Sequence, residues 1–233
     1  MLLGTKSPGM VLGRHLVVMT VAVAMGLGAW ALYSTWSPEM RLWKSFGVPS
    51  MGLLWFAVIV GPASRIWPVL TPVVRWRREA GIWFAVTSAV HGYLVWDGWA
   101  RWDFAGLLGY QFSPEAQMYL RAEPGFGLAN LLGLLALALG LVLAATSFDR
   151  AVAFFGIASW KWMHGLAYVI FYLVAMHVVY FALIHYSPSP TRMTMYEPNP
   201  LRYYYLLLLL TAAATQAAAF VMTVWRRRTV GAF

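Results

Sequence analysis

Residues 160–186 read WKWMHGLAYVIFYLVAMHVVYFALIHY, a stretch long enough to cross a bilayer as one helix. Two histidines, His164 and His177, lie inside this apolar run, and a third, His91, lies in a second apolar segment. An ionisable side chain at membrane depth costs about 2.5 to 3.5 kcal/mol for the charged types and usually marks a functional site. Neutral imidazole is cheaper to insert, but its ring nitrogens need partners, and a metal centre supplies one. The pattern therefore predicts a metal-binding membrane protein.

The composition is typical of an integral membrane protein. Of the 233 residues, 61% are hydrophobic and 11% are charged, whereas a soluble domain averages about 25% charged residues. Cysteine is absent, which excludes disulfides, iron–sulfur clusters, thiolate-ligated heme and covalent attachment through a CxxCH motif. Any heme must then be b-type, held by histidine or methionine side chains.

Six apolar segments predict an all-α bundle that forms a single transmembrane domain over residues 1–233. The expected spans are 15–36, 50–67, 80–99, 125–146, 160–184 and 203–225. Residues 37–49, which contain two prolines, are expected to form an outer loop, and Gly61-Pro62 is expected to kink or end the second span. The connection 100–124 is polar and is either a solvated loop or a segment that covers a site or docks a partner. Residues 185–202, with four prolines, are expected to form another outer loop.

The net charge of +9 is distributed asymmetrically over this topology. Eleven basic residues fall on one side, namely Lys6, Arg14, Arg65, Arg75, Arg77, Arg78, Arg150, Lys161, Arg226, Arg227 and Arg228. The other six basic residues share the opposite side with six of the eight acidic residues. This is the positive-inside pattern, so both termini are predicted to be cytoplasmic. The charge is explained by the membrane lipid and requires no nucleic acid as a partner.

Comparison of depth pairs His91 with His177. With both termini inside, the third and fifth spans run in the same direction, and each histidine lies eight residues before the outer end of its span, at Trp99 and His185. The two imidazoles should therefore lie at similar height and hold one low-spin heme between the third and fifth helices. His185 itself is expected to lie at the membrane interface.

His164 is expected nearer the inner face. It lies thirteen residues before His177, which corresponds to about 19.5 Å along a helix. That separation is too long for one heme and suits a second one. His15, at the inner end of the first span, is a candidate partner for His164 or an interfacial residue. A quinone or FMN ring could occupy the inner site instead.

Small residues accompany the histidines. Gly92 follows His91 and would leave room for a macrocycle. Gly133 and Gly140 lie seven residues apart, on one face of the fourth helix, where small residues allow either a helix or a flat macrocycle to approach closely.

These segments resemble the ferric reductase-like transmembrane family. The resemblance rests on Arg77 and Arg78 in the loop before His91, on a fourth span ending LALALGLVLAATS, and on a fifth reading SWKWMHGLAYVIFYLVAMH. It covers roughly residues 75–180 and is closest to the heme-binding membrane subunits of periplasmic methionine sulfoxide reductase systems. Larger family members have a second histidine about fourteen residues before the position of His91, where this chain has Arg77.

The resemblance implies a six-helix membrane protein with one or two b-type hemes, whose iron ligands are His91, His164 and His177. It also implies electron transfer from a cytosolic flavin reductase or a quinol to a soluble acceptor at the outer, periplasmic face, as one subunit of an oxidoreductase. Two other readings stay open: a structural or accessory subunit of a larger membrane complex, and a stand-alone ferric or cupric reductase.

Overall fold

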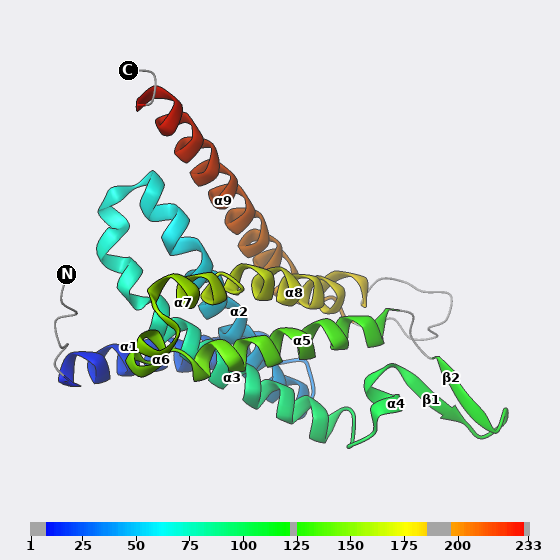
Figure 1. Cartoon of the computed structure of the whole chain (residues 1–233). Coiled ribbons are helices and arrows are strands. Elements are labelled where there is room, and N and C mark those ends of the chain that lie inside the picture. The colour runs from blue at the N-terminus through cyan, green and yellow to red at the C-terminus, as the bar shows by residue number, and fades with distance from the viewer. Residues whose placement is uncertain (1–7, 122–124, 186–196, 231–233) are drawn as a thin grey trace.

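The computed structural model describes residues 8–121, 125–185 and 197–230 (Figure 1). Most of the expected outer loop 185–202 lies outside these residues. The elements in chain order are α1 (Pro8–Leu32), α2 (Pro38–Ile66), the 3₁₀ helix η1 (Pro68–Trp76), α3 (Arg77–Gly98), α4 (Phe104–Leu107), β1 (Tyr110–Ser113), β2 (Met118–Arg121), α5 (Phe126–Ala145), α6 (Asp149–Phe155), α7 (Ile157–His164), α8 (Ala167–Val179), the π-helical turn η2 (Tyr180–Ile184) and α9 (Arg202–Val230).

The chain is an all-α, multi-pass membrane protein with one small β-hairpin. Five helical stretches in its described part are long and apolar enough to cross a membrane: Gly9–Leu32, Pro38–Ile66, Phe126–Ala145, Ile157–Ile184 and Arg202–Thr229. The expected third span corresponds to α3, whose 22 residues would extend about 33 Å. Polar side chains such as Thr87, Ser88 and His91 make α3 less apolar than the other five. A sixth crossing and the side of the termini therefore stay predictions.

The expected outer loop at residues 37–49 is wrong, because this stretch is the first part of α2. The Ser37 hydroxyl accepts a hydrogen bond from the backbone N–H of Met40 at 3.3 Å, and Pro38 occupies the first turn, where a missing N–H costs nothing. Pro49 and Pro62 both lie inside the helix, as membrane helices tolerate. Gly61-Pro62 does not end α2, which continues to Ile66.

The fifth span is less regular than expected. It begins earlier, at Ile157 rather than residue 160, and a turn at residues 165–166 separates α7 from α8. The Gly165 N–H donates to the carbonyls of Lys161 and Trp162, both at 3.0 Å. The last turn of the fifth span is the wider π-helical turn η2, in which the His185 N–H donates to the Tyr180 carbonyl at 2.8 Å. The first and last spans also differ, because α1 covers residues 8–32 and α9 covers 202–230.

The connection after α3 contains regular structure. It forms the short helix α4, capped by the Asp103 carboxylate, which accepts from the N–H groups of Ala105 and Gly106 at 2.9 and 3.1 Å. The antiparallel hairpin β1–β2 follows, with Tyr110 paired to Arg121 and Ser113 to Met118, and it extends away from the helices (Figure 1).

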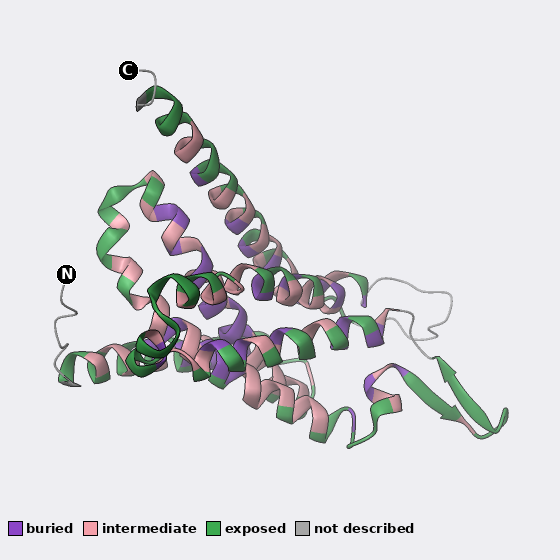
Figure 2. Cartoon of the chain, in the orientation of Figure 1, coloured by how far each residue is buried: buried purple, intermediate pink, exposed green. Residues whose placement is uncertain are grey.

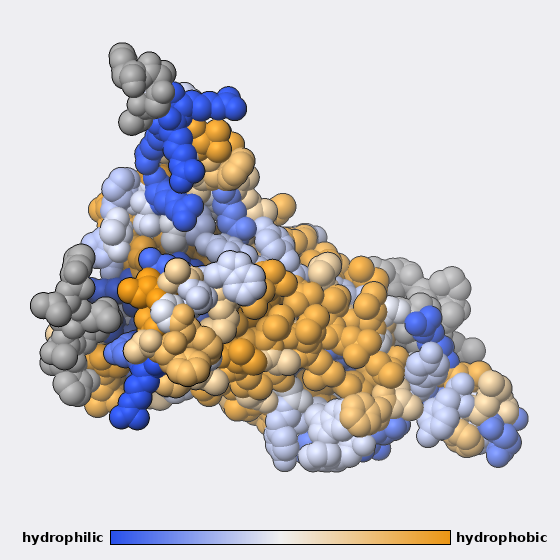
Figure 3. Space-filling model, viewed as in Figure 1, coloured by the Kyte–Doolittle hydropathy of each residue, from blue (hydrophilic) through white to orange (hydrophobic). Residues whose placement is uncertain are grey.

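The core lies where α2 meets the other helices. Buried positions concentrate on the inward faces, and the outward faces are exposed (Figure 2). Tyr33, Met51, Val58 and Phe171 are each 0–1% exposed. The surface over α5 and α8 is continuously apolar in Figure 3, while hydrophilic groups gather toward the ends of the helices. This arrangement positions α2, α3, α5 and α8 around one internal space.

Candidate cofactor site

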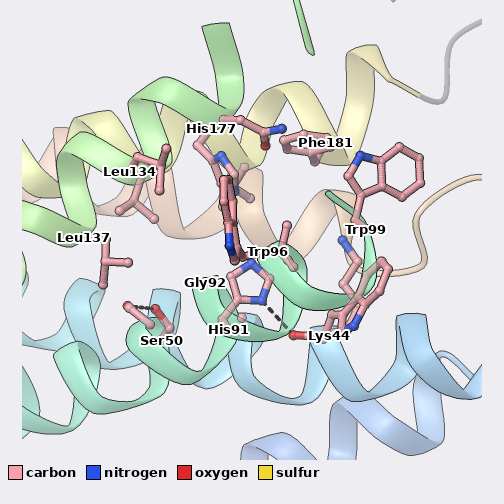
Figure 4. Close-up of a pocket in the computed structure, with 18 of the residues that line it drawn as sticks. Lys44, Ser50, His91, Gly92, Trp96, Trp99, Leu134, Leu137, His177 and Phe181 are labelled. Carbon is pink, nitrogen blue, oxygen red and sulfur yellow. Dashed lines mark hydrogen bonds between the residues drawn. The ribbon is translucent and has the colours of Figure 1, made fainter. Parts of the chain in front are cut away.

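A cavity of about 510 Å³ lies between α2, α3, α5 and α8. Its size falls within the range of about 300–1,000 Å³ that is usual for ligand and cofactor sites. His91 from α3 and His177 from α8 both line it. Figure 4 shows the two imidazole rings pointing toward each other across this space. The structure thus brings together the two histidines that the depth comparison paired.

Both imidazoles are held by the same kind of hydrogen bond. His91 Nδ1 lies 2.9 Å from the Trp43 carbonyl oxygen, and His177 Nδ1 lies 2.8 Å from the Ala129 carbonyl oxygen. A carbonyl oxygen can only accept, so each Nδ1 must carry the ring proton. In the neutral imidazole each Nε2 then keeps its lone pair. A backbone carbonyl on the far nitrogen is the usual way in which proteins orient a metal-ligating histidine.

A glycine lies against each of these rings. A Cβ atom added at Gly47 would lie 3.2 Å from Cε1 of His91, and one added at Gly133 would lie 2.8 Å from Nδ1 of His177. Each glycine is four residues after the carbonyl that binds the same ring, one helical turn along α2 or α5. The absence of a side chain at each glycine therefore lets the ring approach the helix that accepts its hydrogen bond.

Gly92 and Gly140 lie where two helices approach each other, and Gly92 also lines the cavity. A Cβ at Gly92 would meet Leu137 of α5 at 3.0 Å, and one at Gly140 would meet Phe84 of α3 at 2.9 Å. Gly92 and Gly140 thus bring α3 and α5 together. Gly140 thus allows the close approach of a helix. Gly133 lies against His177 and lines the cavity, so the approach of a macrocycle there stays a prediction.

The cavity is built from two equivalent helix hairpins, α2–α3 and α5–α8, related by a shift of 86 residues. Trp43, Gly47 and His91 in the first hairpin correspond to Ala129, Gly133 and His177 in the second. Other lining positions correspond at the same shift: Met40 with Phe126, Lys44 with Asn130, Ser88 with Val174, Gly92 with Val178, Val95 with Phe181, Trp96 with Ala182 and Trp99 with His185. The first helices of the two hairpins run in the same direction, so this is a parallel repeat.

The two ends of the cavity differ in polarity. At the end where α3 and α8 finish, which we call the polar end, the lining includes Lys44, Asn130, His185 and Asn199. Figure 4 shows Lys44 beside Trp99 on one side of the imidazoles, with Leu134 and Leu137 on the other. At that second, apolar end Phe84 and Val174 also contribute. The hydroxyls of Ser50 and Ser88 lie there too, 2.6 Å apart and bonded to each other.

Part of the 100–124 connection covers the polar end, since Trp102 and Leu107 both line the cavity. Trp102 is 63% exposed, and its indole N–H donates to the Asp97 carboxylate at 2.9 Å. Arg101 and Trp102 have φ values of 49° and 61°, which are unfavourable for bulky side chains. Strained backbone of this kind is concentrated at functional sites, and here it turns the Trp102 side chain back over the cavity.

His164 and His15 lie outside the cavity lining. His164 Nε2 is 3.2 Å from the Thr146 hydroxyl, and its ring stacks on Trp160 with centroids 3.9 Å apart. His15 is half-buried on α1. In the described residues no three His, Cys, Asp or Glu side chains cluster as a metal site.

Sequence reasoning missed several lining residues. His185 is 8% exposed and lies against Phe126, Tyr180 and Phe181, and it lines the cavity. Its depth relative to the membrane interface stays a prediction. Lys44 was assigned to an outer loop, and the roles of Trp43, Ala129 and Gly47 were not foreseen. Comparing the two histidine-containing parts of the sequence could have indicated them, because an alignment of His91 with His177 also aligns Gly47 with Gly133.

Comparisons with family models, with curated proteins and with solved structures find no match to this chain.

Proposed function

We propose that this protein binds one b-type heme in the cavity, with Nε2 of His91 and of His177 as the two axial ligands, and transfers electrons across the membrane as a subunit of a reductase system. One observation carries the proposal. Two imidazoles from different helices face a single cavity, and each has its Nδ1 proton bonded to a backbone carbonyl at 2.8–2.9 Å.

The donor set fits this cofactor. His91 and His177 would hold the heme iron, since histidine is one of the side chains that ligate heme iron in proteins. When bound, heme iron supplies one-electron chemistry by alternating between its ferric and ferrous states. The chain's own contribution is to fix the orientation of both rings, through the carbonyls of Trp43 and Ala129 and the space left by Gly47 and Gly133. A fully occupied axial set favours electron transfer over chemistry on a bound substrate.

The direction of electron flow rests on sequence. The positive-inside pattern places the polar end of the cavity toward the outer face. A cytosolic flavin reductase or a quinol would then donate from the arginine-rich side, and a soluble acceptor would receive electrons near Trp99 and Trp102. The proposed inner-membrane location rests on the resemblance to the ferric reductase-like transmembrane family, and the proposed orientation rests on the charge pattern.

The test is hemin titration of the full-length apoprotein in detergent, followed by visible spectroscopy before and after reduction with dithionite. We expect one equivalent of low-spin heme. His91→Gly and His177→Gly should each abolish the low-spin bands, and free imidazole should restore them, because the glycine leaves the ligand position open. His164→Gly is the matched control, since His164 lies outside the cavity, and it should keep the spectrum. A colourless protein, or loss of the bands in His164→Gly alone, would refute the proposal.

Transfer across the membrane needs a second measurement. Protein in liposomes would be given an impermeant reductant on one side and a trapped ferric chelate on the other. Heme-loaded protein should reduce the trapped chelate, and His177→Gly should not. Equal rates for both proteins would contradict the electron-transfer role while leaving heme binding intact.

A further inference from the structure

Lys44 brings a positive charge to the polar end of the cavity. Its side chain lines the space beside Trp99 (Figure 4). The ammonium lies over two aromatic rings, 5.9 Å from the centroid of Tyr33 and 5.6 Å from that of Trp36. Aromatic faces attract a cation, at about 0.5–2 kcal/mol each, but they do not neutralise it.

No carboxylate compensates this ammonium among the described residues. The ion pairs found there join Arg14 to Glu79 and Arg78 to Asp149. The described residues that line the cavity include no Asp or Glu. A charge removed from water is costly unless it is paired, so a lysine in this position is suited to a ligand that brings its own anionic group.

The repeat shows that this cation belongs to one half of the cavity. The position equivalent to Lys44 in the second hairpin is Asn130. The Asn130 side chain is neutral, and its amide NH₂ donates one hydrogen bond to the Leu107 carbonyl at 2.8 Å. The two hairpins have matching histidines but differ at this position, where one has a charged lysine and the other a neutral asparagine. The cavity is therefore asymmetric in charge.

We propose that Lys44 binds a carboxylate of the porphyrin, so that the macrocycle lies with its carboxylate edge at the polar end and its hydrocarbon edge at the apolar end. The inference rests on the proposed function. A flat ligand with two anionic groups on one edge matches a cavity with an ammonium at one end and Leu134, Leu137 and Val174 at the other. The ammonium and carboxylate would form a charge-assisted hydrogen bond, which is stronger than a neutral one.

The experiment compares two probes, hemin and hemin dimethyl ester, whose carboxylates are blocked. Each would be titrated into the full-length apoprotein with its native Lys44 and into the Lys44→Met and Lys44→Arg variants. We expect Lys44→Met to weaken hemin binding about 10- to 100-fold, the range for a hydrogen bond to a charged group. The ester should bind the native protein and the Lys44→Met variant with equal affinity, and Lys44→Arg should retain most of the affinity for hemin. Lys161→Met is the matched control, because Lys161 is exposed on α7 and outside the cavity.

Each outcome has a distinct meaning. If Lys44→Met weakens hemin and its ester equally, or neither of them, while low-spin bands still form, the carboxylate contact is wrong and the heme proposal stands. If the native protein forms no low-spin bands with either probe, both proposals fail. Thermal unfolding of the apoproteins identifies a variant that has lost its fold, and Lys44→Arg then provides the comparison.

Discussion

His91 and His177 are bound in the same way, each by a backbone carbonyl that lies 48 residues earlier in the chain. The correspondence extends to the glycine beneath each ring, Gly47 for His91 and Gly133 for His177. Two rings with matched supports present matched Nε2 atoms to the same cavity. The fold therefore orients both imidazoles through backbone atoms, which few side-chain substitutions elsewhere would disturb.

Substitution by alanine should have a larger effect at the glycine beneath His177 than at the glycine beneath His91. A Cβ at Gly133 would lie 2.8 Å from the ring, whereas one at Gly47 would lie 3.2 Å away. We expect Gly133→Ala to displace His177 and cost about 1–3 kcal/mol, as overpacking does, with a large loss of low-spin heme. Gly47→Ala should have a smaller effect on both measurements.

Gly81→Ala on α3 is the matched control for these two substitutions, because nothing lies within 4 Å of its Cβ position. It should be neutral or stabilise the helix by up to about 1 kcal/mol. Equal thermal unfolding and equal heme content for Gly133→Ala and Gly81→Ala would show that His177 does not rest against Gly133.

Trp102 should limit access to the polar end of the cavity. Its side chain lines the space while 63% exposed. If heme occupies the site, Trp102→Ala should speed oxidation of the reduced heme by ferricyanide severalfold without loss of the low-spin bands. Alanine keeps a Cβ at a φ of 61°, so the backbone strain is unchanged and the comparison isolates the indole. An unchanged rate would mean that oxidants enter elsewhere.

The buried ion pair between α1 and α3 should contribute strongly to stability. Arg14 and Glu79 are 3.0 Å apart, with side chains 13% and 1% exposed. Glu79→Ala would leave the guanidinium without its carboxylate, at a cost of up to about 3–5 kcal/mol. In contrast, Asp149, paired with Arg78, is 87% exposed, and Asp149→Ala should cost about 0–1 kcal/mol. The measurement is the unfolding midpoint of the Glu79→Ala and Asp149→Ala variants in detergent.

Replacing both members of the buried pair separates its two effects. Arg14→Met combined with Glu79→Leu should recover most of the stability lost in Glu79→Ala, because no buried charge is then left uncompensated. A double variant as unstable as the single one would show that the pair itself, rather than the orphaned charge, determines stability.

Periodicity and depth predicted the helical architecture and brought His91 and His177 to one site. The counting worked because both spans end where the chain becomes polar, at Trp99 and His185. The prediction was wrong at the start of α2, where Pro38 and Pro49 indicated a loop. Pro38 fits the first turn of the helix, and Pro49 is accommodated inside a long membrane helix. Because Lys44 lies in the segment that was expected to be a loop, its place in the cavity was not predicted.

The hydrogen bonds to the two histidines could not be predicted from the sequence, because residues of every type have a backbone carbonyl that can accept a hydrogen bond. Trp43 and Ala129 differ completely as side chains, and they act through the same backbone atom. Their positions become visible only when the two hairpins are aligned at a shift of 86 residues. A second heme at His164 is the alternative to the one-heme proposal, and it would appear as a second equivalent of heme that His164→Gly removes.

The membrane topology depends on whether α3 crosses. The chain contains no cysteine, so single cysteines can be introduced without background at Gly9, Glu115 and Thr229, which are all exposed. An impermeant maleimide applied to one side of membrane vesicles then reports which of them share a side. With six crossings, Gly9→Cys and Thr229→Cys should react from the same side and Glu115→Cys from the other.

If α3 does not cross, the hairpin returns to the side of the N-terminus and every later segment is inverted. Glu115→Cys would then react together with Gly9→Cys, and Thr229→Cys would react from the opposite side. We expect the six-crossing result, because it places Arg75, Arg77 and Arg78 on the same side as Arg226, Arg227 and Arg228. Separating these two arginine clusters across the bilayer would oppose the positive-inside bias, and the polar side chains of α3 are accommodated because several of them face the cavity rather than lipid.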